Sequence, residues 1–131
     1  MAEHPDITLI RKGYDAFNRA DVATLSEVLA SDVEHHMFGD SQVSGDYKGL
    51  EDVLGFYGRL AELTGGTYGC DIESMFTDGN GKVVVVHRQR GERNGRQITP
   101  RQALIFTVVG GKVVDLHDTT EDLEAEDTFW G

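Results

Sequence analysis

The fold is decided by KVVVVHRQR (residues 82–90), RQALIFTVV (101–109) and KVVDLHDT (112–119), three runs with the composition of consecutive β-strands. The first two runs flank Asn94-Gly95. This dipeptide is a strong hairpin signal, because both central positions of a type I′ turn need a positive φ. If Arg93 pairs with Arg96 across the turn, His87 lies directly opposite Gln102.

The second turn, at Gly110-Gly111, allows two registers. A plain two-residue loop puts Asp118 beside Ala103, whereas a three-residue loop with a bulge puts Asp118 opposite Gln102. Because a slip of one residue moves every side chain to the other face, hydrophobic segregation favours the second register. One face then contains Val83, Val85, Leu104, Phe106, Val114 and Leu116, with His87, Gln102 and Asp118 at its rim. Polar groups at the edge of an apolar face predict a small-molecule pocket.

The chain length and charge exclude several classes of protein. We expect the 131 residues to form one domain, 1–131. The net charge of −11 argues against nucleic acids and membranes as partners. No stretch approaches the roughly 18 apolar residues of a membrane span. The single Cys70 cannot form an internal disulfide, and together with the lack of a secretory signal it predicts a cytoplasmic protein.

The order of elements predicts an α+β fold. Apolar residues recur at helical spacing in residues 6–19, 22–30 and 50–63, and further strands are expected at 32–38 and 68–77. Three helices in the N-terminal half would therefore pack on a curved, mixed or antiparallel sheet and form a cone-shaped α+β barrel.

The other face of the sheet is too apolar for a surface in contact with water. It would hold Val84, Val86, Ala103, Ile105 and Val113. Such a patch usually marks a partner surface, so the sequence predicts a homodimer through the outer face of the sheet. His117 and Asp115 are expected on this face in a structural role.

Three blocks identify the chain as similar to a known family. They are IRKGYDAFNRADVATLSEVLASDVEHH (10–36), SGDYKGLEDVLGFYGRLAELTGG (44–66) and LIFTVVGGKVVDLHDTTEDLEAEDTFW (104–130). They resemble the SnoaL-like branch of the nuclear transport factor 2 (NTF2-like) superfamily, which includes polyketide cyclases and relatives of ketosteroid isomerase. This resemblance implies a cone-shaped fold for nearly the whole chain.

The resemblance also implies roles for individual residues. Asp118 matches the acid/base Asp of the cyclases, and Gln102 matches their Gln one strand away. The cyclases usually have His two residues after that Gln, where this chain has Leu104. Tyr14 could correspond to the first-helix Tyr of the isomerases, and His36 occupies the position at which many SnoaL-like members have a His.

Candidate catalytic residues are Asp118, His36 and His87. Burial against an apolar floor should raise the pKa of Asp118, which would let it exchange protons near neutral pH. Candidate substrate-binding residues are Gln102, the aromatic residues Tyr14, Phe17 and Tyr57, and the floor residues Leu104, Phe106 and Leu116. Adjacent residues on a strand point to opposite faces, so His35 and His36 cannot share one metal ion, and we expect no metal and no cofactor.

Two functions remain open from the sequence. The first is a cofactor-independent enzyme, of the ketosteroid isomerase or polyketide cyclase type, that acts on a small apolar molecule with a carbonyl group. In it Asp118 would move a proton while Gln102 and His87 hold the oxygen; epoxide opening is a variant of this chemistry. The second is a protein of the same fold that binds a ligand or a partner without catalysis, which Leu104 at the position of the family His favours.

Overall fold

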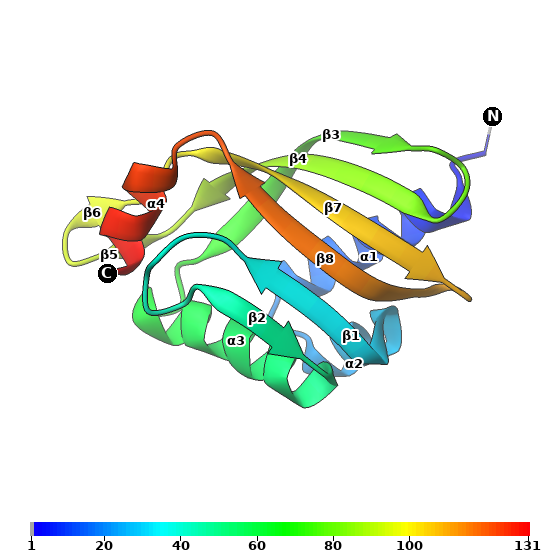
Figure 1. Cartoon of the computed structure of the whole chain (residues 1–131), viewed down its shortest axis with the longest axis horizontal. Helices are drawn as coiled ribbons and strands as arrows, with labels where there is room; N and C mark the ends of the chain where they lie inside the picture. Colours follow the sequence, from blue (N-terminus) through cyan, green and yellow to red (C-terminus); the bar gives the residue numbers. More distant parts are fainter. Residues whose placement is uncertain (1) are drawn as a thin grey trace.

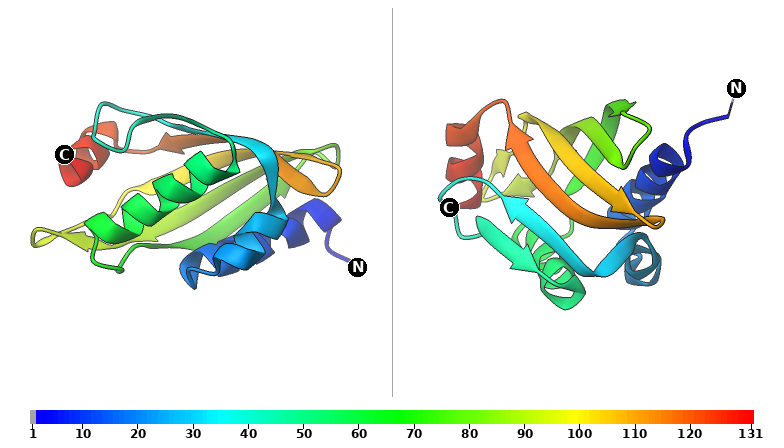
Figure 2. Two further views of the ribbon diagram at one scale, coloured as in Figure 1. Left: turned by 90° about the horizontal axis from the view of Figure 1, so that it is seen from below. Right: turned by 45° about the vertical axis from the view of Figure 1, so that its right-hand side comes forward.

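The computed structural model describes residues 2–131 as a curved six-stranded sheet with helices on its concave face (Figures 1 and 2). The helices are α1 (Pro5–Asn18), α2 (Val22–Val28), α3 (Leu50–Leu63) and α4 (Leu123–Trp130). The sheet contains β1 (Leu29–Met37), β2 (Gly45–Lys48), β3 (Gly69–Thr77), β4 (Lys82–Arg90), β7 (Arg101–Val109) and β8 (Lys112–Thr120). A small hairpin of β5 (Glu92–Arg93) and β6 (Arg96–Gln97) extends from one end.

The strands are ordered β2-β1-β8-β7-β4-β3. The pair β1–β8 is parallel and the other four neighbouring pairs are antiparallel, so the sheet is mixed. Figure 2 shows α1, α2 and α3 along one face of this sheet, with α4 at the end where the chain terminates. The predicted α+β architecture is confirmed. None of the helices in residues 2–131 is long and apolar enough to cross a membrane.

Local sequence signals explain where the first helices begin. The His4 side chain accepts a hydrogen bond from the backbone N–H of Asp6, and Pro5 occupies the first helical position, where its missing N–H costs nothing. Asp21 caps α2 by accepting from the backbone N–H of Thr24. The capped helices then pack the apolar sides of α1 and α2 onto the concave face of the sheet.

The core lies between the helices and the concave face. Its buried residues include Ile7, Ile10, Tyr14, Val28, Val33, Val53, Val83, Val85, Leu104, Phe106, Val113 and Leu116. A second cluster near α4 contains Met37, Val43, Phe56, Leu60, Ile98, Phe129 and Trp130. At about 1.5–3 kcal/mol for each large side chain, this burial is the main contribution that opposes chain entropy.

The β4–β7 register agrees with the sequence prediction. Arg93 pairs with Arg96 around Asn94 (φ 52°) and Gly95 (φ 77°), and His87 is the partner of Gln102. Both turn residues have the positive φ that a type I′ turn requires.

The predicted β7–β8 register is wrong by two residues. The turn is a two-residue loop of Gly110 and Gly111, both with positive φ, but the register then shifts between Thr107 and Val108. Because β8 carries an extra residue at this bulge, Asp118 lies opposite Leu104, and Gln102 lies opposite Thr120. A shift of two residues preserves the face, so Asp118 still points to the concave side.

The bulge also exchanges the two valines at the start of β8. Val113, expected on the outer face, is 1% exposed and belongs to the core, whereas Val114, expected in the core, is only partly buried. The other predicted outer-face residues, Val84, Val86, Ala103 and Ile105, are half-buried or exposed. Their pairing with a second copy of the chain remains a prediction.

Candidate active site in the apolar cavity

A cavity of about 80 Å³ lies between the helices and the concave face of the sheet. One water molecule needs about 10–15 Å³ of such volume, so the cavity has room for a small ligand. Its walls are predominantly apolar and aromatic. They include Ile10, Phe17, Val28, Met37, Phe56, Leu60, Tyr68, Leu104, Phe106, Val113, Leu116 and Trp130, with the polar groups of Tyr14, His35, Tyr57, Cys70, His87, Gln102 and Asp118.

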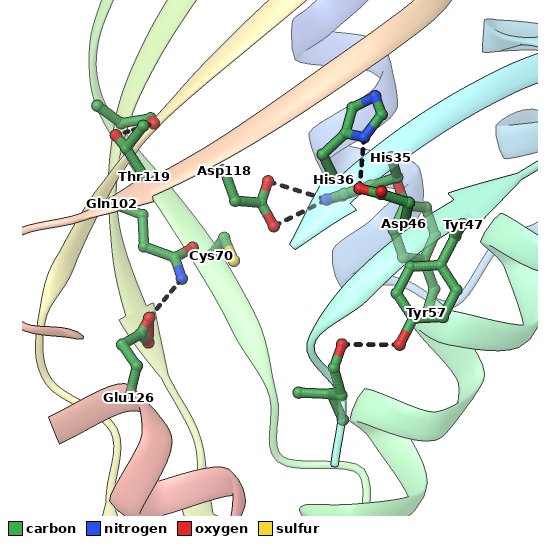
Figure 3. A network of polar contacts seen from close by, with 12 residues as sticks. His35, His36, Asp46, Tyr47, Tyr57, Cys70, Gln102, Asp118, Thr119 and Glu126 are labelled. Carbon is green, nitrogen blue, oxygen red and sulfur yellow. Dashed lines mark hydrogen bonds and ion pairs between the residues drawn. The ribbon is translucent and has the colours of Figure 1, made fainter. Parts of the chain in front are cut away.

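The first polar cluster in the cavity is formed by His35, Asp118 and Tyr57, and Figure 3 shows the contact between His35 and Asp118. His35 Nε2 lies 2.8 and 2.9 Å from the two Asp118 carboxylate oxygens. The Tyr57 hydroxyl lies 2.9 Å from His35 Nδ1. The His35 and Asp118 side chains are only 5% and 6% exposed, so they form a buried imidazole–carboxylate pair.

The strands place this pair by register. His35 on β1 is the partner of Leu116 on β8, and Asp118 follows two residues later on the same face. The His35 ring also packs edge-on against Phe56, with 5.0 Å between centroids. Sheet and helix α3 therefore fix the imidazole from two sides.

The hydrogen-bond donors in this cluster follow from the carboxylate. A carboxylate only accepts, so it takes a hydrogen bond from His35 Nε2, and in a neutral imidazole Nδ1 is then the acceptor for the Tyr57 hydroxyl. Burial, with a smaller contribution from the charge of Asp118, raises the pKa of Tyr57. Tyr57 therefore stays protonated as a donor to the imidazole at neutral pH.

The second polar cluster is a chain of four side chains. The Tyr14 hydroxyl lies 2.6 Å from His87 Nδ1, His87 Nε2 lies 2.8 Å from Gln102 Oε1, and Gln102 Nε2 donates to Glu126 Oε2 at 2.7 Å. An ionised Glu126 orients the Gln102 amide, which orients the His87 proton onto Nε2 and leaves Nδ1 to accept from Tyr14. Both ring nitrogens of His87 are therefore engaged within the protein.

Glu126 at the end of this chain is completely buried. Burial raises its pKa to about 7, although the hydrogen bonds from Gln89 and Gln102 favour the ionised form. Burial also lowers the pKa of His87, against the opposing effect of its bond to Gln102. His87 is therefore neutral at neutral pH, whereas Glu126 changes its protonation state in this pH range.

Most of the predicted site residues surround the cavity. Asp118, His87, Gln102, Tyr14, Phe17, Tyr57, Leu104, Phe106 and Leu116 all contribute to its walls. His36 does not: it points to the outer face of the sheet, where its ring bonds Asp46 and Asp115. The neighbouring His35 enters the cavity instead. Strand alternation gives the reason, since Val33, His35 and Met37 share the buried face of β1.

Besides His35, the sequence did not single out Glu126, Trp130 and Cys70 as residues of the cavity region. Glu126 and Trp130 lie on α4, a helix outside the three that the sequence predicts. Trp130 is 1% exposed, and among residues 2–131 its indole Nε1 is the one buried side-chain nitrogen or oxygen without a hydrogen-bond partner. Cys70 is the third; burial raises the pKa of its thiol to about 12. A Phe-Trp pair at the end of an acidic helix is a signal that could have predicted docking of α4.

Comparison with known proteins agrees with this architecture. The family model described as a SnoaL-like domain matches residues 10–116. The chain belongs to the SnoaL-like family. This SnoaL-like chain is also 32% identical over 130 residues to the uncharacterized protein Rv0034 of Mycobacterium tuberculosis, with 99% of each chain covered.

Solved structures show the same fold. Bal32a, from a soil-derived mobile gene cassette, is 32% identical, with a TM-score of 0.95 and 97% of each chain covered. A protein from Jannaschia sp. CCS1 assigned as a SnoaL-like polyketide cyclase is 18% identical, with a TM-score of 0.81 and coverage of 98% of this chain and 92% of that one. The fold is that of the NTF2-like proteins, and it is related to that of the polyketide cyclases.

Proposed function

We propose that this SnoaL-like protein is a cofactor-independent acid/base catalyst of the isomerase or cyclase type, with a small, mostly apolar carbonyl compound as substrate. The observation that carries the proposal is the buried His35–Asp118 pair in the wall of an apolar cavity. A carboxylate held beside a bound molecule and away from bulk water is suited to moving a proton at carbon.

In the proposed reaction, Asp118 removes a proton from the carbon next to the carbonyl group. The C–H bond breaks, an O–H bond forms on Asp118, and the electron pair moves to the carbonyl oxygen as an enolate. One Nε2–H of His35 cannot occupy every lone pair of the carboxylate, so Asp118 can still accept this proton. The proton then returns at another carbon, or the enolate carbon attacks a second carbonyl and closes a ring, and the alkoxide formed from that carbonyl takes the proton from Asp118. Opening of an epoxide by an activated water is a variant with the same base.

The position of His35 bears on the absence of His at position 104. Strand β8 lies between β1 and β7, so Asp118 has His35 on one side and Leu104 on the other. The related cyclases are expected to have a His at the Leu104 position. In this chain an imidazole reaches the same carboxylate from the opposite neighbouring strand, which supports retention of an acid/base pair.

The oxygen that gains charge needs hydrogen-bond donors from the wall. The sequence predicts His87 in this role, but both of its ring nitrogens are engaged by Tyr14 and Gln102. Gln102 gives one of its two amide hydrogens to Glu126, and the indole N–H of Trp130 has no partner within residues 2–131. We therefore assign the remaining Gln102 hydrogen and the Trp130 N–H as donors to the ligand.

Hydrogen–deuterium exchange of small ketones tests the proposal. Cyclohexanone and cyclopentanone are incubated with the protein in deuterated buffer, and mass spectrometry follows label uptake at the carbon next to the carbonyl. We expect the wild type to accelerate exchange and Asp118→Asn to lose about 10²–10⁴-fold of that acceleration. Asn keeps an oxygen that can accept from His35, which limits the structural disturbance.

The matched control is Asp71→Asn, an exposed aspartate on β3 that pairs with Arg90 at the surface. We expect it to exchange the ketones as fast as the wild type. Full activity in Asp118→Asn, or equal losses in both variants, would show that Asp118 is not the base.

A second function is favoured by one observation. Both ring nitrogens of His87 are bonded to Tyr14 and Gln102, so His87 has no free nitrogen with which to exchange a proton with a ligand. This is the arrangement of a pocket that binds a ligand without catalysis. Native mass spectrometry of the purified chain separates the two functions. A retained small molecule without ketone exchange would favour a carrier or a ligand sensor of the same fold.

A further inference from the structure

A second cluster of ionisable side chains lies on the outer face of the sheet. His36 on β1 and His117 on β8 are register partners in the parallel pair, and their rings stack with centroids 4.2 Å apart and an interplanar angle of 18°. Asp115 precedes His117 by two residues on the same face of β8. This cluster is separated from the cavity by the thickness of the sheet, because His35 and Asp118 point to the concave side.

The distances in this cluster are those of metal ligands. His36 Nε2 lies 3.0 Å from Asp115 Oδ1, and His117 Nε2 lies 3.3 Å from Asp115 Oδ2. One ligand atom from each residue can be chosen so that all three lie within 4.8 Å of one another. In a tetrahedral zinc site with bonds of about 2.0–2.1 Å, the ligand atoms are roughly 3.3 Å apart. The two rings are stacked with an interplanar angle of 18°, so binding would turn them out of the stack until both Nε2 lone pairs point at one ion.

Asp46 provides the hydrogen bond to the second ring nitrogen that metal-binding histidines usually have. Its carboxylate, on β2, lies 2.7 Å from His36 Nδ1 (Figure 3). A carboxylate that accepts from Nδ1–H fixes the ring and directs the lone pair of Nε2 toward the ion. Asp46 thus contributes a carboxylate–histidine–metal arrangement without being a ligand itself.

We propose that His36, Asp115 and His117 form a binding site for Zn²⁺ on the outer face of the sheet, with Asp46 orienting His36. Two imidazoles and one carboxylate match the ligands of zinc, whereas Ca²⁺ and Mg²⁺ prefer sets made only of oxygen. The side chains are 23%, 28% and 57% exposed for His36, Asp115 and His117, so an ion can enter and a water can take the fourth position.

The sequence predicts no metal, because His35 and His36 face opposite sides of the strand. That argument holds for this pair of adjacent residues, but His36 has a partner in the neighbouring strand. Parallel pairing of β1 with β8 brings His117 beside it, 81 residues further along the chain. The pairing of His36 with His117 can be recognised only once the order of the strands is known.

Calorimetric titration of the tag-free full chain with ZnCl₂, after removal of metals by a chelator, tests the site. We expect one Zn²⁺ per chain, and a visible absorption band of tetrahedral type when CoCl₂ is used instead. His117→Gln and His36→Gln should each weaken Zn²⁺ binding by at least tenfold, and Asp46→Asn should weaken it by about 10–100-fold.

The control is His4→Gln, which changes a histidine at the start of α1, away from the cluster. It should bind Zn²⁺ like the wild type. Because the His117 side chain is more than half exposed, His117→Gln should fold normally, and circular dichroism can verify that. Absence of stoichiometric binding in the wild type would overturn the proposal, and so would binding that survives both His36→Gln and His117→Gln.

Discussion

The buried carboxyl of Glu126 makes the stability of this protein depend on pH in an unusual direction. Its side chain is completely buried, and burial raises its pKa from 4.5 to about 7. A group whose pKa is higher in the folded state than in the unfolded state stabilises the fold fully below its unfolded value. That stabilisation is lost as the pH rises through the folded value. The contribution of Glu126 to stability should therefore be lost between about pH 4.5 and pH 7.

The pKa shift sets the size of this effect. A change from 4.5 to about 7 corresponds to about 3 kcal/mol in the free energy of unfolding, as an order of magnitude. Glu126→Gln removes the titration, but its single amide oxygen can accept from only one of Gln89 and Gln102, and its NH2 group faces the other donor. The lost bond should cost about 1–3 kcal/mol at pH 4.5, and raising the pH to 8 should shift the difference in favour of the variant by up to about 3 kcal/mol.

Urea unfolding of both proteins at several pH values between 4.5 and 8 measures this difference. The quantity of interest is the difference between wild type and Glu126→Gln at each pH, because other titrating groups cancel in it. The reasoning would be refuted by a difference that does not change with pH. A variant that becomes relatively less stable as the pH rises would refute it too.

Three further predictions concern other parts of the molecule. Tyr57→Phe leaves His35 Nδ1 without its donor and should lower the free energy of unfolding by about 1–2 kcal/mol in urea; an unchanged midpoint would contradict the bond. Cys70 is 6% exposed with a pKa of about 12, so Ellman's reagent at pH 8 should label it only after unfolding in urea, and rapid labelling of the native protein would argue against burial. Ile105→Glu should convert the proposed outer-face homodimer into monomers by sedimentation velocity, and a wild type that is already monomeric would disprove that dimer.

The sequence predicted the parts of the fold in which local chemistry determines geometry. Asn94-Gly95 fixes its own turn type, and the turn fixes which residues of β4 and β7 are partners. The bulge in β8 was not predictable in the same way. Val113 and Val114 are equally apolar, so the hydrophobic pattern cannot tell which of them is the extra residue.

The residues of the candidate site also differ in whether the local sequence can predict them. Asp118 and Gln102 were found because they interrupt apolar strand faces, and His35 could have been found from Val33 and Met37 on either side of it. Glu126 could not, because an acidic residue in an acidic segment indicates a surface exposed to solvent. Its burial depends on Gln89 and Gln102, which meet it only when α4 folds over the end of the sheet.

The parallel pair β1–β8 connects the two sites proposed for this protein. Consecutive residues of each strand serve opposite faces: His35 and Asp118 form the cavity pair, while His36 and His117 form the outer cluster. A slip of one residue in either strand would exchange an inner group for an outer one and destroy both arrangements. The register of each strand must therefore be fixed by its buried apolar residues. Val33 on β1 and Leu116 on β8, at 0% and 3% exposed, do this because a slip would expose them to water. These two core residues take no part in the proposed chemistry, but they hold the register that places the reactive side chains on their two faces.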